Sequence, residues 1–107
     1  MLRAARTDAN AREIDKALVK LGATIAKTDS AGSGFPDRVI GFRGKNFLLE
    51  YKDGEKVPSK RQLNEAQKKW HSAWAGQVAV VKSPDEAVRI VFGSDKRYEG
   101  PADYGEQ

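Results

Sequence analysis

Residues 34–52, which read GFPDRVIGFRGKNFLLEYK, predict the part of the fold on which the rest depends. Two apolar runs in this stretch, Val39-Ile40 and Phe47-Leu48-Leu49, have the length and composition of short β-strands. Between them stands Arg43-Gly44, which is a turn signal. The stretch is therefore expected to form a β-hairpin.

The register of this hairpin decides where its charged side chains lie. A two-residue turn would pair Phe42 with Lys45 and place Asp37 opposite Glu50. Directly opposed side chains lie ~4.5–5.5 Å apart at Cβ, so two carboxylates there oppose the pairing unless a cation compensates them. Because side chains alternate along a strand, Lys52 shares the face of Glu50. One polar cluster is thus expected, and the other face of the strand is apolar, with Phe47, Leu49 and Tyr51.

Two features leave this register open. Arg43 is not the Asn or Asp that tight hairpin turns prefer, and a one-residue slip would move Asp37 to the opposite face. A solvated hairpin face with an ordinary Glu50–Lys52 ion pair would produce the same alternation of charges. The spacing alone therefore supports either a cation site or a solvent-exposed face.

The motif as a whole favours the cation site. Gly34-Phe35-Pro36-Asp37, followed by Glu50-Tyr51-Lys52 behind an apolar strand, resembles the motif of the PD-(D/E)XK nuclease superfamily, and most of all its minimal phage-type VRR-NUC domains. The resemblance extends from Glu13 to about Phe92. It implies a restriction-endonuclease-like fold, nuclease activity and a Mg²⁺ or Mn²⁺ cofactor.

The residues of the cluster suit the hydrolysis of a phosphodiester bond. Mg²⁺ is commonly held by one or two carboxylates and keeps several waters, so Asp37 and Glu50 are the expected ligands, with the Tyr51 carbonyl as a further one. Lys52 would orient and help deprotonate the attacking water, or balance charge on the phosphate. One metal ion or two fits this set equally well.

The first helix is expected from about residue 7 to Leu21, where Gly22 supplies the stop. Glu13 borders its apolar stripe and could lean toward the hairpin, although an exposed helical Glu is the more ordinary outcome. The resemblance implies that a Glu of the first helix completes the acidic site. Glu13 takes this place as an outer or second-metal ligand, and Asp15 is the weaker candidate. The stripe itself consists of Ile14, Ala17, Leu18 and Leu21.

A second helix is expected between Ser59 and Gly76, because Ser59 and Gln62 form a capping-box pattern and Gly76 ends the periodic segment. Gln67 lies on its apolar face, so it is either a satisfied core amide or part of the site. The resemblance favours the site. The helical spacing predicts core positions, rather than base-stacking surfaces, for both tryptophans. The apolar face carries Leu63, Ala66, Trp70, Ala73 and Trp74.

Short strands are expected at residues 23–27 and 77–81, with a Gly- and Ser-rich loop over residues 28–34. Ser83 and Pro84 begin a third helix that Gly93 ends. This order of elements predicts an α/β domain with a mixed sheet of about four strands and three helices. The expected buried residues of the third helix are Ala87, Val88, Val91 and Phe92.

Residues 1–93 are expected to form a single VRR-NUC-like domain, and residues 94–107 a polar tail that is disordered or packs on a partner subunit. The chain carries a net charge of +4, and residues 1–93 carry 17 basic and 11 acidic side chains, a net charge of +6. This excess suits a polyanion such as DNA, although such charges are often only solvated surface. The expected phosphate contacts are Gly34, Arg38, Arg43, Lys45, Lys56, Lys60, Arg61, Lys68 and Lys69.

Composition excludes several classes of site. There is no cysteine, hence no disulfide and no thiolate metal site, and the single histidine, His71, is expected at a helix surface. No apolar run suits a secretory signal or a membrane span, so a cytoplasmic location, in a bacterial or phage-infected cell, is the default. No loop or nucleophile pattern indicates an organic cofactor.

These observations predict a Mg²⁺-dependent endodeoxyribonuclease. Proteins of this size and type resemble Holliday-junction resolvases, which implies branched DNA as the substrate, a homodimer, and a role in phage replication, recombination or repair. The alternative is a non-catalytic DNA-binding or regulatory module, because basic helices and an acidic hairpin do not require turnover.

Overall fold

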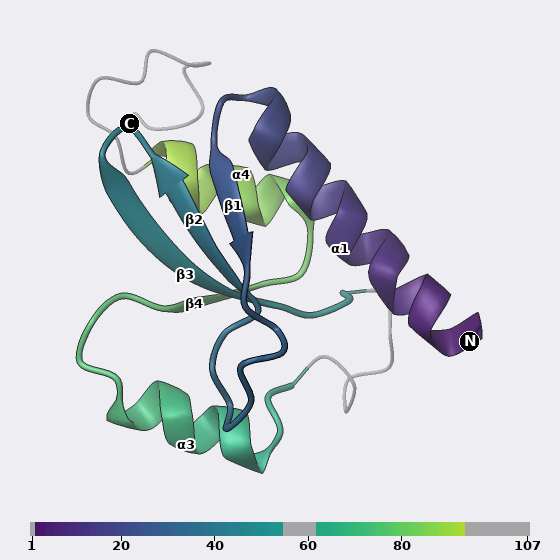
Figure 1. The fold of residues 1–107 in the computed structure, drawn as a ribbon, viewed down its shortest axis with the longest axis vertical. Helices are drawn as coiled ribbons and strands as arrows, with labels where there is room; N and C mark the ends of the chain where they lie inside the picture. The colour runs from purple at the N-terminus through teal and green to yellow at the C-terminus, as the bar shows by residue number, and fades with distance from the viewer. Residues whose placement is uncertain (1, 55–61, 94–107) are drawn as a thin grey trace.

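The computed structural model describes residues 2–54 and 62–93, and it describes side chains from residue 9 onward. Predictions that rest on Lys56, Ser59, Lys60, Arg61 or the tail 94–107 lie outside these residues. The elements, labelled in Figure 1, are α1 (Leu2–Lys20), β1 (Thr24–Lys27), β2 (Arg38–Phe42), β3 (Lys45–Tyr51), α3 (Glu65–Ala73), β4 (Ala79–Val81) and α4 (Pro84–Gly93).

The four strands form one mixed sheet in the order β1-β2-β3-β4. β1 and β2 pair antiparallel, as do β2 and β3, whereas β4 lies parallel to β3. A parallel neighbour requires a crossover connection, and here the crossover contains α3. The predicted α/β architecture with a mixed four-stranded sheet is confirmed. Among the described residues, no helix is both long and apolar enough to span a membrane.

The hairpin register is confirmed. Phe42 pairs with Lys45 and Arg38 with Leu49, which is the register of a two-residue turn. Arg43 and Gly44 have φ angles of +50° and +81°, so both take the left-handed conformations of a type I′ turn. The Arg43 guanidinium lies 4.9 Å from the centre of the Phe42 ring, a cation–π contact that favours this turn despite the non-glycine residue.

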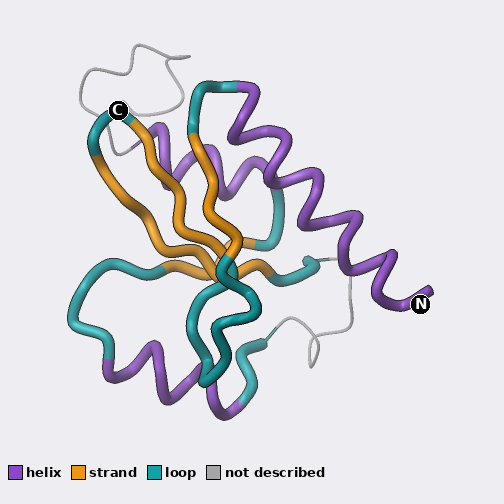
Figure 2. The backbone as a smooth tube through the Cα atoms, viewed as in Figure 1, coloured by secondary structure: helices purple, strands orange, loops and turns teal. Residues whose placement is uncertain are grey.

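The core lies between the sheet and the helices α1 and α4, which pack against each other (Figure 2). The predicted buried residues of α4 are confirmed, and its cap is formed by Ser83, whose Oγ accepts from the Glu86 N–H at 3.2 Å. Leu21 was expected in the core but is 47% exposed, because α1 ends at Lys20 and Gly22, at φ +107°, turns the chain away. The buried apolar residues include Ile14, Leu18, Ile40, Leu49, Val81 and Val91.

The second predicted helix begins later than expected. α3 starts at Glu65 and is capped by Asn64, whose Oδ1 accepts from the Gln67 N–H while the Gln67 side chain accepts from the Asn64 N–H. Gln62, predicted to lie within the helix, precedes it. No residue of α3 is buried, and Figure 1 shows the helix standing apart from the sheet. The predicted core position of Trp74 is therefore wrong, since this residue is 41% exposed.

The loop between β1 and β2 extends from the sheet to the beginning of α3 (Figure 1). Gly34 has a φ angle of +84° and lies so close to α3 that a Cβ there would collide with the carbonyl of Ala66. Gly34 therefore serves a close backbone contact, and its expected contact with phosphate stays a prediction.

Gly34→Ala should destabilise the fold by about 2 kcal/mol or more, because it adds this collision to the cost of a left-handed alanine. Gly32→Ala is the matched control: its φ of +81° is similar, but a Cβ there would meet nothing within 4 Å. The two free energies of unfolding can be compared by urea titration. Equal losses in the two variants would contradict the close contact between Gly34 and α3.

Candidate active site

Asp37 and Glu50 lie together where the hairpin strands end. Asp37 directly precedes β2, and the pairing of Arg38 with Leu49, continued by one residue, places Asp37 opposite Glu50. Asp37 Oδ2 accepts a hydrogen bond of 2.8 Å from the Tyr51 N–H. An N–H and C=O of one strand residue point to the same side, so the Tyr51 carbonyl also lies on the side of Asp37.

The Glu50 carboxylate is almost completely withdrawn from solvent, with 1% of the residue exposed. Its Oε2 accepts a 2.7 Å hydrogen bond from Gln67 Nε2 and lies 3.9 Å from Lys52 Nζ. Its Oε1 is buried and has no hydrogen-bond donor among the described residues. A buried carboxylate oxygen without a donor is costly, so this atom needs either a proton or a cation.

Burial, followed by the charge of Asp37 and a hydrogen bond with it, raises the pKa of Glu50 to about 8, and Lys52 opposes this shift only in part. Without a divalent cation, Glu50 is therefore mostly protonated at neutral pH.

The pair fits Mg²⁺, which binds to one or two carboxylates and retains part of its water shell. Two carboxylates, a carbonyl on the same side and an unsatisfied buried oxygen supply suitable ligands. A cavity of about 100 Å³ lies beside Asp37, between α1 and the ends of the hairpin strands, and has room for several waters at ~30 Å³ each. It is lined by Asn10, Ala11, Asp29, Asp37, Arg38, Tyr51, Lys52 and Asp53.

The structure does not bring Glu13 into this pair. Glu13 is exposed and lines a different cavity, of about 580 Å³, together with Asp53 and Glu86. Among the described residues, no three acidic or histidine side chains are grouped to hold a metal ion. α1 instead contributes Asn10, one turn before Glu13, whose Nδ2 donates to the Lys52 carbonyl at 3.0 Å. Sequence reasoning missed Asn10, although it lies on the same helical face as Glu13.

Arg38 was expected to contact phosphate, and this prediction is wrong. The residue is 5% exposed, and its guanidinium donates to both carboxylate oxygens of Asp15, at 3.1 to 3.3 Å. Burial opposes the charge, but the hydrogen bonds and charge of Asp15 prevail and raise the pKa of Arg38. Tyr51 also donates to Asp15, at 2.8 Å. Arg38 lines the cavity beside Asp37, but its guanidinium is held in a structural ion pair with Asp15.

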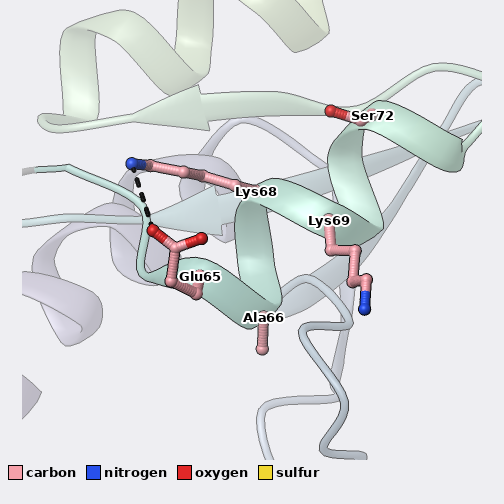
Figure 3. Close-up of a pocket in the computed structure, with 5 residues that line it drawn as sticks. All are labelled: Glu65, Ala66, Lys68, Lys69 and Ser72. Carbon is pink, nitrogen blue, oxygen red and sulfur yellow. Dashed lines mark ion pairs between the residues drawn. The ribbon is translucent and has the colours of Figure 1, made fainter.

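The residues that were expected to contact phosphate lie in different parts of the fold. Arg43 and Lys45 are at the turn, ~20 Å from Asp37 at ~3.3 Å per strand residue, so the structure does not bring them to the site. Lys68 and Lys69 lie on α3, where they line a surface pocket of about 570 Å³ (Figure 3). Lys68 Nζ lies 3.7 Å from Glu65 Oε2, whereas Lys69 points to the other side of the helix (Figure 3).

Gln67 links α3 to the site. Its Oε1 accepts from the Asn64 N–H and from Lys52 Nζ, both at 2.9 Å, while its Nε2 donates to Glu50. The amide is thereby oriented from both ends. The structure brings Gln67, Glu50 and Lys52 together, so the amide is satisfied by two residues of the candidate site, and its functional role stays a prediction.

His71 follows Gln67 by one helical turn and was expected at the surface. It is half-buried instead, and its Nε2 is withdrawn from solvent without a hydrogen-bond partner among the described residues. Burial, and then the positive charge of Lys52, lower the pKa of His71. The imidazole therefore faces the site side of α3 and is largely neutral at neutral pH.

The raised pKa of Glu50 makes the stability of the metal-free protein depend on pH. A carboxyl whose folded-state pKa of about 8 exceeds its ordinary value of 4.5 stabilises the fold fully below the ordinary value, and this contribution is lost as pH rises through the folded value. The free energy of unfolding in EDTA should therefore fall by on the order of a few kcal/mol between about pH 5 and about pH 9.

Glu50→Gln tests whether Glu50 is the group that titrates, because the glutamine amide stays neutral at every pH. Its side-chain oxygen can still accept the hydrogen bond from Gln67 Nε2. Urea titrations of both proteins across the same pH range would measure the difference between their slopes. If the two slopes coincide, Glu50 is not the group that titrates.

The arrangement of these elements has a counterpart among solved structures. A structure described as a VRR_NUC domain superposes with a TM-score of 0.57 and 22% sequence identity, covering 81% of this chain and 91% of that chain. The chain has the fold of a VRR_NUC domain. No protein-family model and no curated protein matches the sequence.

The VRR_NUC fold confirms the restriction-endonuclease-like architecture that the hairpin motif predicted. The similarity concerns the arrangement of helices and strands. The chemistry of the chain has to be argued from Asp37, Glu50, Lys52 and Gln67 themselves.

Proposed function

We propose that this protein is a Mg²⁺-dependent endonuclease that hydrolyses phosphodiester bonds in DNA. The observation that carries the proposal is the carboxylate pair of half-buried Asp37 and fully buried Glu50, with a Glu50 oxygen that has no donor among the described residues and Lys52 beside it. The similarity to a VRR_NUC domain supports the same function.

Each residue of the cluster would have a separate task. Bound to Asp37 and Glu50, Mg²⁺ would supply charge neutralisation for the phosphate in the transition state. Lys52, held 2.9 Å from Gln67 Oε1, would orient the attacking water or balance charge on the phosphate. Gln67 would fix the directions of Glu50 and Lys52, and Asn10 would hold the strand end through the Lys52 carbonyl.

The substrate would be held mainly through its phosphates. Lys68 and Lys69 lie on the helix that carries Gln67, and Lys56, Lys60 and Arg61 belong to the chain just before it. Contacts of this kind release counterions, so the affinity for DNA should decrease as salt concentration rises.

We further propose that the preferred substrate is branched DNA, with four-way junctions foremost, and that two copies act together. A two-fold symmetric junction requires two symmetry-related cuts, which a homodimer provides.

A cleavage panel tests this proposal. Labelled four-way junctions, flaps, forks and blunt duplexes of one sequence would be incubated with Mg²⁺, Mn²⁺ or EDTA, and the products resolved on denaturing gels. We expect cuts that need the divalent cation and are fastest on branched DNA. Binding without cleavage under every condition would instead support a non-catalytic DNA-binding module, and equal cleavage of all four would overturn the branched preference.

A further inference from the structure

Three aromatic side chains gather at α3, outside the core: Trp70 of the helix, its C-cap Trp74, and Phe35 of the loop before β2. Trp70 and Trp74 stack with ring centres 4.6 Å apart and planes inclined by 20°, and Phe35 meets Trp70 edge-on at 5.2 Å. We call Phe35, Trp70 and Trp74 the aromatic cluster. No residue of α3 is buried, and Trp74 is 41% exposed. A helix that places its only two indoles outside the core has a surface suited to a ligand.

The aromatic cluster is held in place by the sheet. The Trp74 indole N–H donates to the Gln77 carbonyl at 3.1 Å, and Gly76 packs against the same edge of the indole. The Gln77 amide in turn exchanges two hydrogen bonds with the backbone of Leu48 in β3, at 2.7 and 3.2 Å. The exposed part of the cluster is therefore preorganised, which reduces the entropy lost when a ligand binds.

The aromatic cluster continues directly from the candidate active site. Gln67 and Trp70 lie on one face of α3, because residues three apart share a helical face, and the C-cap Trp74 stacks on Trp70. Gln67 bonds to Glu50 and Lys52, and Phe35 precedes Asp37 by two residues. The cluster thus begins one helical turn after Gln67, and its two indoles are separated by ~6 Å along the helix axis, at ~1.5 Å per residue.

We propose that the aromatic cluster binds an unpaired base of the DNA strand whose backbone enters the Asp37–Glu50 site. Aromatic side chains bind bases through their π-faces, and these faces are accessible only where a base is not stacked within a duplex. Lys68 and Lys69 on the same helix provide positive charge for the adjoining phosphates. The substrate class is therefore DNA with unpaired nucleotides next to the cut, such as a fork, flap or open junction. This inference rests on the proposed nuclease function.

Intrinsic fluorescence tests the inference without requiring cleavage. The chain has two tryptophans, both in the aromatic cluster, so its indole emission reports on this surface alone. In EDTA, a single-stranded oligonucleotide and a fork should quench the emission, whereas a blunt duplex of equal charge should bind more weakly and quench less. Trp74→Leu should reduce single-strand affinity roughly 10-fold, because stacking contributes this much or more per base.

Two further variants serve as controls. Trp74→Phe keeps an aromatic ring that can stack on a base. It should therefore retain most of the affinity, although it loses the indole N–H. Val19→Ala changes an apolar residue of α1 that is 56% exposed, and it should have no effect on DNA affinity. Binding in these assays is followed by fluorescence anisotropy of labelled DNA.

The possible outcomes separate this inference from the proposed function. Equal binding of single strand and blunt duplex, unaffected by Trp74→Leu, would overturn base binding by the aromatic cluster. It would leave the proposed nuclease function standing. Failure to bind any DNA would overturn both. If Trp74→Leu instead converts a dimer to a monomer in sedimentation experiments without changing DNA affinity, the cluster is an interface between two copies and the inference is wrong.

Discussion

Asp37→Asn should remove Mg²⁺-supported cleavage, with a loss of at least ~10³-fold in the rate of the chemical step, since metal binding supplies several kcal/mol of transition-state stabilisation. The substitution discards a charged ligand and keeps nearly the same volume. Its side-chain oxygen can still accept from the Tyr51 N–H, which Asp37 binds at 2.8 Å. The fold should therefore survive, and single-turnover cleavage of a labelled junction would measure the loss.

Glu50→Gln should have the same effect on cleavage, because it removes the other carboxylate of the pair. Asp85→Asn, an exposed acid in the first turn of α4, is a control that should cut normally. Circular dichroism of all three variants would show whether each is folded. Normal cleavage by both Asp37→Asn and Glu50→Gln would mean that the metal site has been assigned to the wrong residues.

Lys52→Met should slow the chemical step by on the order of 10²-fold or more while DNA affinity changes little, if the ammonium acts mainly in the transition state. Methionine keeps most of the alkyl stem of Lys52 and removes the amine, which lies 2.9 Å from Gln67 and 3.9 Å from Glu50. Single-turnover cleavage and equilibrium binding, measured on the same variant, separate the two effects.

Lys69→Met provides the matched control, because it makes the same chemical change on the exposed surface of α3. It should weaken binding and its salt dependence without slowing the chemical step of bound DNA. Near-normal cleavage by Lys52→Met would reduce Lys52 to a structural partner of Glu50. Loss of binding in a folded Lys52→Met variant would make it a phosphate contact instead.

The hairpin and its polar cluster could be predicted from sequence because two local signals agree there. The alternation along β3 separates Glu50 from Leu49 and Tyr51, and Gly44 supplies one of the two positive φ angles that a tight turn needs. The burial of Arg38 could also have been predicted from sequence. Alternation places Arg38 on the same face as Ile40 and Phe42, both of which are buried.

The beginning of α3 could not be fixed from sequence because two capping-box patterns follow one another. Ser59 with Gln62 and Asn64 with Gln67 have the same spacing, and the structure uses the second. The exposure of Trp74 could not be predicted from sequence for another reason. Helical periodicity identifies an apolar face but not what covers it, and α3 does not pack on the sheet.

Gln67 gives the beginning of α3 a significance beyond its own stability. One oxygen, Oε1, accepts from both the Asn64 N–H and Lys52, so helix capping and the orientation of a candidate catalytic amine depend on the same rotamer. Fraying of the first helical turn would release Lys52 and one hydrogen bond of Glu50 in the same event. The competent population of the site would then equal the population in which this turn is closed, and amide hydrogen exchange at the turn would report both.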